Sequence, residues 1–330
     1  MALMLILAAV IVAILAMCVY CYHVSFYSPN RTPMDPYGPH HGRQYLAVLK
    51  ELHAATRTME NATSETVTIS SHDGLTLTGH YYHQQAGAPL MLLFHGYRSM
   101  YLRDCAGGYA LGKKFAMNIL AVDQRAHEKS GGHTISFGVL ERRDCFRWVQ
   151  YANKRFGAQT PIVLCGLSMG AATVLMATDQ ALPKNVVAVM ADCPYESPKA
   201  IIKKVCRDRD FAPNLSYPFI RLAGLLFGHF DLEESSAIQA ASHTDIPILL
   251  LHGEDDHFVP CDMSRNIHKA APGNTQLVTF PGAGHGLSYA LHPERYEQVC
   301  RDFLLQISAL TPHFKNREIA QIDCSFSSDI

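Results

Sequence analysis

Five short and almost wholly apolar runs follow one another through the middle of the chain: PLMLLF, NILAVD, PIVLCG, VVAVMAD and IPILLLHG. Strands have this composition when their sheet is covered on both faces, as in the parallel sheets of α/β proteins. Stretches with helical patterns, such as 140–156 and 169–178, separate the runs. This alternation predicts a doubly wound, mostly parallel sheet, with QLVTF as its last strand and 294–307 as the closing helix.

Three other segments complete the predicted fold. Residues 67–83 alternate around a His-Asp-Gly turn and indicate a hairpin, and 44–57 predicts a helix that packs beside the domain. More than fifty residues separate Asp192 from Ile246, and they include the apolar stretch YPFIRLAGLLFGHF. An ordinary connection is much shorter, so we expect a small helical cap inserted over the strand ends.

The composition sets limits on the class of protein. A chain of 330 residues that is 48% hydrophobic and 17% charged can bury a large core, which excludes disorder throughout. The formal net charge of -1 gives no electrostatic attraction toward nucleic acid. Of the ten cysteines, Cys165 and Cys193 lie in apolar runs, which is typical of unpaired core thiols and favours a reducing compartment.

The first 22 residues carry no charged side chain and are almost entirely apolar. A helix of this length rises far enough to cross a hydrocarbon core of about 30 Å, so we expect a single-pass membrane anchor. A cleaved signal sequence is the alternative, but a basic start and a small-residue cleavage site are not evident. Lipidation at Cys18 is a weaker alternative, because Met17 stands where the acylation box has a small residue. Arg31, just behind the segment, favours a cytoplasmic catalytic domain only slightly.

These patterns divide the chain into consecutive parts. Residues 1–22 form the anchor, 23–62 a linker and helix, and 63–310 the α/β domain. The cap occupies about 194–244 within that domain, and 311–330 is a polar tail.

A candidate nucleophile lies in the sequence G-L-S-M-G at 166–170, between a predicted buried strand and a predicted helix. A G-x-S-x-G motif in this context places its serine on a sharp strand-to-helix turn, where side chains at the glycine positions would clash. We therefore predict that Ser168 is a nucleophile. A serine hydroxyl reacts readily only when a base accepts its proton, so a histidine and an orienting acid should follow.

The candidate base is His285, which lies between two glycines in PGAGHG, just after the last predicted strand. Its place in the chain order, its loop position and its glycine neighbours distinguish it from the other histidines, of which there are 18 in all. The candidate acid lies in HGEDDHFVP, directly after IPILLL, where such sheets build their sites. We favour Asp256 over Asp255, and expect His252 and His257 to hold the loop geometry.

An oxyanion that forms on attack at Ser168 needs two preorganised donors. The backbone N–H of Met169, directly after the nucleophile, is the first candidate. The second is the backbone N–H of Tyr97, because PLMLLF runs directly into His-Gly-Tyr-Arg-Ser at 95–99. A simple strand-ending turn is the alternative interpretation of that segment.

Taken in order, the blocks HGYRS, VDQRAHEKSGG, GLSMGAATVLM, ADCPYESP, HGEDDHFVP and GAGHG resemble the α/β-hydrolase superfamily from about residue 67 to 305. They look most like its serine aminopeptidase-like branch, shared with Bem46-like proteins and many bacterial hydrolases. One residue departs from the pattern: Glu128 stands where relatives usually have glycine. The resemblance implies an α/β-hydrolase fold and hydrolysis through an acyl-enzyme, with no metal and no organic cofactor.

These observations predict a serine hydrolase that cleaves carboxylic esters, with lipophilic small molecules as substrates, a membrane partner through the N-terminal helix and no nucleic-acid partner. The apolar cap and the anchor favour lipophilic esters. A peptidase or aminopeptidase-like amidase is the alternative, because amides use the same three residues. A non-catalytic binding protein with this fold is a further alternative, which the presence of all three residues disfavours.

Overall fold

The computed structural model describes residues 1–29, 34–38 and 43–314. Its centre is one eight-stranded sheet with the strand order β1-β2-β4-β3-β5-β6-β7-β8. Strand β2 runs antiparallel to both β1 and β4, and the remaining pairs are parallel. The strands are β1 (Glu65–Ser70), β2 (Thr76–Tyr82), β3 (Leu90–Phe94), β4 (Asn118–Val122), β5 (Ile162–Leu167), β6 (Val186–Asp192), β7 (Ile248–Gly253) and β8 (Thr275–Phe280).

This sheet confirms the predicted fold class. The five apolar runs are β3 to β7, QLVTF is β8, and residues 67–83 lie in the β1–β2 hairpin. Every residue of β3, β4 and β7 is buried, because helices cover both faces of the sheet.

Two hydrophobic cores lie on the two faces of the sheet. The first includes residues of α5 (Glu141–Phe156), α6 (Met169–Met176), α9 (Ala237–Ser242) and α10 (Asp262–Ala270). The second includes residues of α2 (Leu49–Glu60), α4 (Ala106–Lys114) and α12 (Pro293–Leu305), with the short α3 (Tyr101–Asp104) and α11 (Ser288–Leu291) beside them. The segment expected as one helix over 44–57 is a 3-10 helix, η1 (Arg43–Val48), that continues as α2.

The long connection from β6 to β7 is helical, as expected. It contains α7 (Pro198–Asp208), α8 (Pro213–Ala223), a π-helix η3 (Gly224–Gly228) and α9. A proline at the first helical positions starts α7 and α8, and the Ser197 side chain caps α7 by accepting from the Ala200 N–H.

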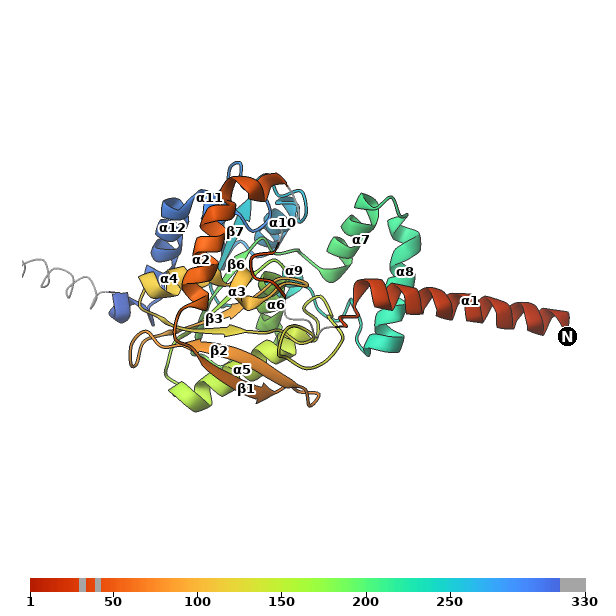
Figure 1. Cartoon of the computed structure of the whole chain (residues 1–330), viewed down its shortest axis with the longest axis horizontal. Helices are drawn as coiled ribbons and strands as arrows, with labels where there is room; N and C mark the ends of the chain where they lie inside the picture. Colours follow the sequence, from red (N-terminus) through yellow and green to blue (C-terminus); the bar gives the residue numbers. More distant parts are fainter. Residues whose placement is uncertain (30–33, 39–42, 315–330) are drawn as a thin grey trace, which may run out of the picture.

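The first helix, α1 (Ala2–Ser25), extends away from the domain, with α7 and α8 beside its base (Figure 1). By length and composition it can cross a membrane, with a mean hydropathy of 3.1 over a window of which 6% is buried. Unlike the rest of the helix, its C-terminal end packs against the domain: Cys18 and Phe26 are fully buried, and α8 and η3 contact the helix. The following residue, Tyr27, forms an isolated antiparallel bridge with Thr134. Arg31, on which the charge argument rested, lies outside the described residues.

Candidate active site

Ser168 occupies the turn between β5 and α6 with backbone angles φ 55 and ψ -114. A left-handed conformation is unfavourable for a residue with a side chain, so this turn is strained. The neighbouring glycines permit it: a Cβ on Gly166 would lie 2.2 Å from the Gly170 backbone, and one on Gly170 would lie 2.1 Å from the Phe94 carbonyl oxygen. The predicted elbow is therefore present, and any side chain at either glycine would displace backbone.

His285 joins the serine to an acid. Its Nε2 lies 3.0 Å from Ser168 Oγ, and its Nδ1 lies 2.7 Å from Asp256 Oδ2. A carboxylate only accepts hydrogen bonds, so Nδ1 carries the proton and its N–H donates a hydrogen bond to Asp256. Nε2 is then unprotonated and can accept a hydrogen bond from the serine hydroxyl. The structure thus brings together the three residues that the sequence singled out.

The charge of Asp256 is held by its surroundings. Its Oδ1 accepts hydrogen bonds from the backbone N–H groups of Phe258 (2.9 Å) and Val259 (2.8 Å). Burial raises the pKa of this carboxyl, but hydrogen bonds from His252 and His285 outweigh burial and hold the pKa well below its ordinary range. Asp256 therefore stays ionised and can stabilise a protonated His285.

Three other polar residues of this loop, His252, Asp255 and His257, contact neighbouring parts of the chain and not Ser168. Asp255 is exposed, and its backbone N–H donates to the Ala283 carbonyl at 3.0 Å. His252 is fully buried, with Nδ1 2.7 Å from Ser264 Oγ. His257 is exposed, and its carbonyl accepts from Lys204 Nζ. Of the two adjacent aspartates, Asp256 is the one that meets the imidazole.

A contact that the sequence analysis missed holds the His285 loop. The Tyr45 hydroxyl, from η1, donates to the His285 carbonyl oxygen at 2.8 Å. The Gln44 side chain lies so close to Gly284 that a Cβ there would be 1.9 Å from its amide oxygen. These contacts join residues about 240 positions apart, and no local pattern in the sequence could have indicated them.

The segments that carry the two predicted oxyanion donors both pass close to Ser168. Met169 is buried at the first position of α6, where a backbone N–H has no partner within the helix. A Cβ on Gly96 would lie 3.5 Å from Ser168 Cβ, so the segment leading to Tyr97 passes close to the serine. The Gly96 N–H donates to Asp104 Oδ2 at 2.7 Å, which fixes this segment.

The side chains of this loop contact the end of α1. The Tyr97 hydroxyl donates to the Ser25 carbonyl at 2.8 Å, and Arg98 Nη2 donates to the carbonyls of Val24 and Tyr27, each at 3.1 Å. Arg98 itself has a φ of 50, and its backbone N–H donates to His127 Nε2 at 3.0 Å. The apolar N-terminal helix therefore ends on the loop beside Ser168.

A cavity of about 700 Å³ opens at Ser168 and extends along the face of the sheet that α2, α4 and α12 cover. Its apolar wall includes Met91, Leu93, Leu52, Leu111 and Met190. Among the described residues, its lining includes none from 194–244, so η1 and α2 cover this cavity and the inserted helices do not.

One acid lies in the lining of the same cavity. Asp192, at the end of β6, is buried, and its Oδ2 accepts from the Tyr296 hydroxyl at 3.0 Å. Burial raises the pKa of Asp192 to about 6.

Glu128, the departure from the family pattern, has a φ of 43 and accepts from the Met34 N–H at 3.2 Å. Burial raises the pKa of Glu128. It lines a second cavity, of about 630 Å³, with His23, Tyr27 and Arg98. The residue thus lies at the junction of the α1 end and the Tyr97 loop, away from the bond between Ser168 and His285.

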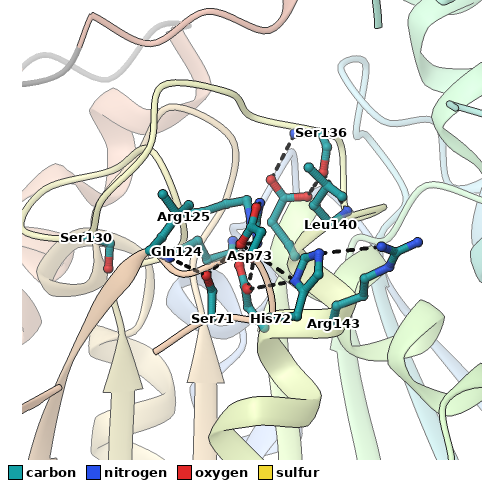
Figure 2. Close-up of polar contacts among 12 residues, drawn as sticks. Ser71, His72, Asp73, Gln124, Arg125, Ser130, Ser136, Leu140 and Arg143 are labelled. Carbon is teal, nitrogen blue, oxygen red and sulfur yellow. Dashed lines mark hydrogen bonds and ion pairs between the residues drawn. The ribbon is translucent and has the colours of Figure 1, made fainter. Parts of the chain in front are cut away.

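A second polar cluster lies near the β1–β2 turn (Figure 2). Arg125 donates to Asp144 at 2.6 and 2.7 Å and to Asp73 at 3.0 and 3.2 Å, and His72 lies 3.9 Å from Asp144. The ligand atoms of His72, Asp73 and Asp144 lie close enough to surround a cation. The Arg125 guanidinium, however, already occupies both carboxylates, so a metal ion would be repelled.

A second group with metal-ligand spacing contains Cys193, Asp256 and His285. Burial raises the pKa of the Cys193 thiol well above its ordinary value, so the thiolate that a metal requires is disfavoured. The other two residues already hydrogen-bond each other.

Comparison with known proteins agrees with this architecture. A family model described as "Alpha/beta hydrolase family" matches residues 91–299. The uncharacterized protein YqkD of Bacillus subtilis (strain 168) is 26% identical over 197 residues, which are 57% of this chain and 62% of YqkD. The chain thus spans about three-fifths of the length of that relative.

Two solved structures share the fold. The esterase Pf2001 of Pyrococcus furiosus has a TM-score of 0.63 and 20% identity, covering 86% of this chain and 98% of its own. Est1E from Butyrivibrio proteoclasticus, with ferulic acid bound, has a TM-score of 0.58 and 22% identity, covering 74% of this chain and 99% of its own.

Proposed function

The chain belongs to the alpha/beta hydrolase family, and from this premise we propose that it is a serine hydrolase that cleaves carboxylic esters through an acyl-enzyme. Ser168 is the nucleophile, His285 the general base and Asp256 the acid that orients the base. The observation that carries the proposal is the position of His285, with one ring nitrogen on Asp256 and the other on Ser168.

The mechanism follows from these contacts. Ser168 Oγ attacks the ester carbonyl while its proton passes to His285 Nε2, and the ionised Asp256 stabilises the imidazolium. The backbone N–H groups of Met169 and Tyr97 stabilise the oxyanion. The imidazolium then gives its proton to the departing alcohol, which leaves an acyl group on Ser168. A water molecule, deprotonated by His285, hydrolyses that acyl group and restores the serine.

Lipophilic esters suit the cavity best. Its wall of Met, Leu and Ala side chains can bury an acyl chain or an aryl group, which apolar burial stabilises by about 0.8 kcal/mol per CH₂ group. The fold neighbour Pf2001 is an esterase by name, and Est1E binds the aromatic carboxylic acid ferulic acid, which supports an ester substrate. Within the family we place the chain in the serine aminopeptidase-like, Bem46-like branch, on its sequence blocks.

We further propose that α1 is a retained membrane anchor and not a cleaved signal. Its buried Cys18 and Phe26, and the hydrogen bonds from Tyr97 and Arg98 to its last carbonyls, support this proposal, because cleavage would remove packing from the domain. The corresponding division is 1–22 anchor, 23–62 linker and helix, 63–310 hydrolase domain with a cap at 194–244, and 311–330 tail, of which residues beyond 314 lie outside the described part.

The test is hydrolysis of p-nitrophenyl esters from acetyl to palmitoyl by the full chain in detergent. We expect activity that is lost in Ser168→Ala and His285→Ala and retained in Asp255→Ala, the matched control on the exposed neighbour of the proposed acid. A fluorophosphonate probe should label the native protein and Asp255→Ala but not Ser168→Ala.

Two outcomes would contradict the proposal in different ways. Labelling at Ser168 without ester hydrolysis, but with cleavage of aminoacyl p-nitroanilides, would make the protein a peptidase. Folded protein with neither labelling nor hydrolysis would make it a non-catalytic member of the family.

A further inference from the structure

Five large apolar side chains of the inserted helices are exposed. They lie on the connection between α7 and α8, on α8 itself and on η3, with exposed fractions of 54, 68, 44, 43 and 36% for Phe211, Leu215, Leu225, Leu226 and Phe227. Exposed apolar residues scattered singly are normal, but a group on consecutive elements indicates a contact surface. We call these five residues the insertion patch.

The insertion patch continues onto α1. Both α8 and η3 pack against that helix, and the Phe227 ring lies 5.9 Å from the Tyr22 ring. In Figure 1, α8 crosses α1 where α1 leaves the domain, and the apolar remainder of α1 projects beyond the crossing. A helix that crosses the base of a membrane span lies along the plane of the membrane surface.

The charges nearby fit the same environment. Arg221 is the one charged residue of α8 and η3, and it pairs with Asp231 at 2.7 Å. At the end of α7, the exposed Arg207 and Arg209 alternate with the exposed Asp208 and Asp210, so the segment next to the patch is charged but carries no net charge. At a membrane interface the long arginine side chains can reach lipid phosphates while the aspartates stay in water, so these charges permit an interfacial position, and the apolar patch itself is the argument for it.

We propose that α8 and η3 lie in the membrane–water interface beside α1, with the insertion patch among the acyl chains and Arg207 and Arg209 at the headgroups. The inserted helices then hold the hydrolase domain against the bilayer. This assignment rests on the proposed anchoring by α1, and the occupant of the patch is a lipid surface because the patch continues the surface of the apolar helix.

Tryptophan quenching tests this placement on the full chain. The native Trp148 is the sole tryptophan and is 1% exposed, so it supplies a constant background. Leu215→Trp and Leu225→Trp report on the patch, and Ile11→Trp reports on α1. Leu291→Trp, at the exposed end of α11 and far from α1, is the matched control. Each variant is reconstituted into vesicles of phosphatidylglycerol and brominated phosphatidylcholine, whose bromines quench only tryptophans in contact with the acyl region.

We expect strong quenching at positions 11, 215 and 225 and none above background at 291. Quenching at 11 without quenching at 215 and 225 would overturn the interfacial placement and leave the anchor intact. Absence of quenching at 11 would overturn the anchor and the placement with it. Ester hydrolysis by each variant shows that its fold is intact, since none of these residues lines the cavity at Ser168.

A second measurement tests whether the apolar side chains of the insertion patch are what keeps η3 in the membrane. In a Phe227→Trp protein, the pair Leu215→Glu and Leu225→Glu should reduce quenching at 227 by about half or more, because carboxylates resist burial among acyl chains. Leu291→Glu, the control of the same chemistry, should leave it unchanged. Equal quenching in both proteins would show that the patch does not hold η3 in the membrane.

Discussion

Two buried acids in this molecule pair with different side chains, a histidine and an arginine, and comparing them separates a catalytic arrangement from a structural one. Asp256 has a fully buried side chain and pairs with His285, which is 14% exposed and extends its other nitrogen to Ser168. Asp144 is nearly as buried and pairs with Arg125, which is 2% exposed. In the first cluster the histidine also contacts the Ser168 hydroxyl, which lines a cavity. In the second cluster the arginine is bonded to two carboxylates (Figure 2).

The difference lies in what each partner can do with a proton. Burial lowers the pKa of the Arg125 guanidinium, but Asp144 and Asp73 outweigh burial and raise that pKa above its already high ordinary value. Arginine therefore stays charged and holds the turn after β4 against the β1–β2 hairpin. Histidine can gain and lose a proton near neutral pH, so an equally buried acid can serve a reaction in the first cluster.

The same substitution made in both clusters should give the largest contrast. Asp256→Asn removes the charge that stabilises protonated His285 and favours the wrong tautomer, so we expect kcat for ester hydrolysis to fall by about 10⁴-fold. Asp144→Asn should leave kcat per folded molecule unchanged. The measurement is kcat normalised to folded protein, and equal losses in both variants would remove the distinction between the clusters.

The next largest effect concerns stability. Arg125→Met leaves Asp144 without its buried cation, so we expect the free energy of unfolding to fall by about 3–5 kcal/mol. The control is Arg155→Met, because Arg155 also makes a two-bond contact, with Glu65, but at the surface, where a pair contributes about 1 kcal/mol or less. Denaturant titration measures both, and similar losses would contradict the argument that the second cluster is structural.

The two clusters also differ in how far the sequence could predict them. The strands, the glycine-flanked turn at Ser168 and the loop positions of Asp256 and His285 follow from local patterns, and the structure brings those three residues together. Their catalytic role remains a prediction. The ion pairs of Arg125 could not be predicted from the sequence, because its partners at 73 and 144 are distant along the chain and come together only in the folded structure.

The sequence also did not indicate which elements line the cavity at Ser168. The long insertion was expected to cover the strand ends, yet η1 and α2 line the cavity while α8 packs against α1. The apolar residues of an amphipathic helix indicate that the helix packs, but not which element it packs on. Tyr45 and its bond to the His285 carbonyl were missed because the bond uses a backbone oxygen, which leaves no trace in the sequence.

Asp192 extends the comparison to a buried acid with no cation hydrogen-bonded to it. Its Oδ2 accepts from the Tyr296 hydroxyl, and its Oδ1 has no hydrogen-bond partner among the described residues. Burial raises its pKa from 3.8 to about 6, so the native state binds a proton that the unfolded chain releases between these values. The wild-type protein should therefore lose roughly 3 kcal/mol of stability as the pH rises from 4 to 8.

Asp192→Asn, which stays neutral, should lack this loss. The measurement is the free energy of unfolding across that pH range for both proteins, with their difference plotted against pH so that other titrating groups cancel. A difference that does not change with pH would show that Asp192 is ionised in the native state. Burial in the absence of a cationic partner would then not be enough to keep this carboxyl protonated.

The smallest expected effect tests whether catalysis at Ser168 depends on the hydrogen bond between the Tyr97 loop and the end of α1. Tyr97→Phe keeps the backbone N–H and the stacking on Phe137 but removes the hydrogen bond to the Ser25 carbonyl. A hydrogen bond contributes about 1 kcal/mol, so we expect kcat to fall about fivefold with KM unchanged, because the loop donor acts on the oxyanion and not on the bound ester. Tyr22→Phe is the control, since it removes another bond between α1 and the domain, at Thr134, away from this loop. A fall in kcat of the same size in Tyr22→Phe would mean that α1 supports the domain in general and does not position the Tyr97 amide.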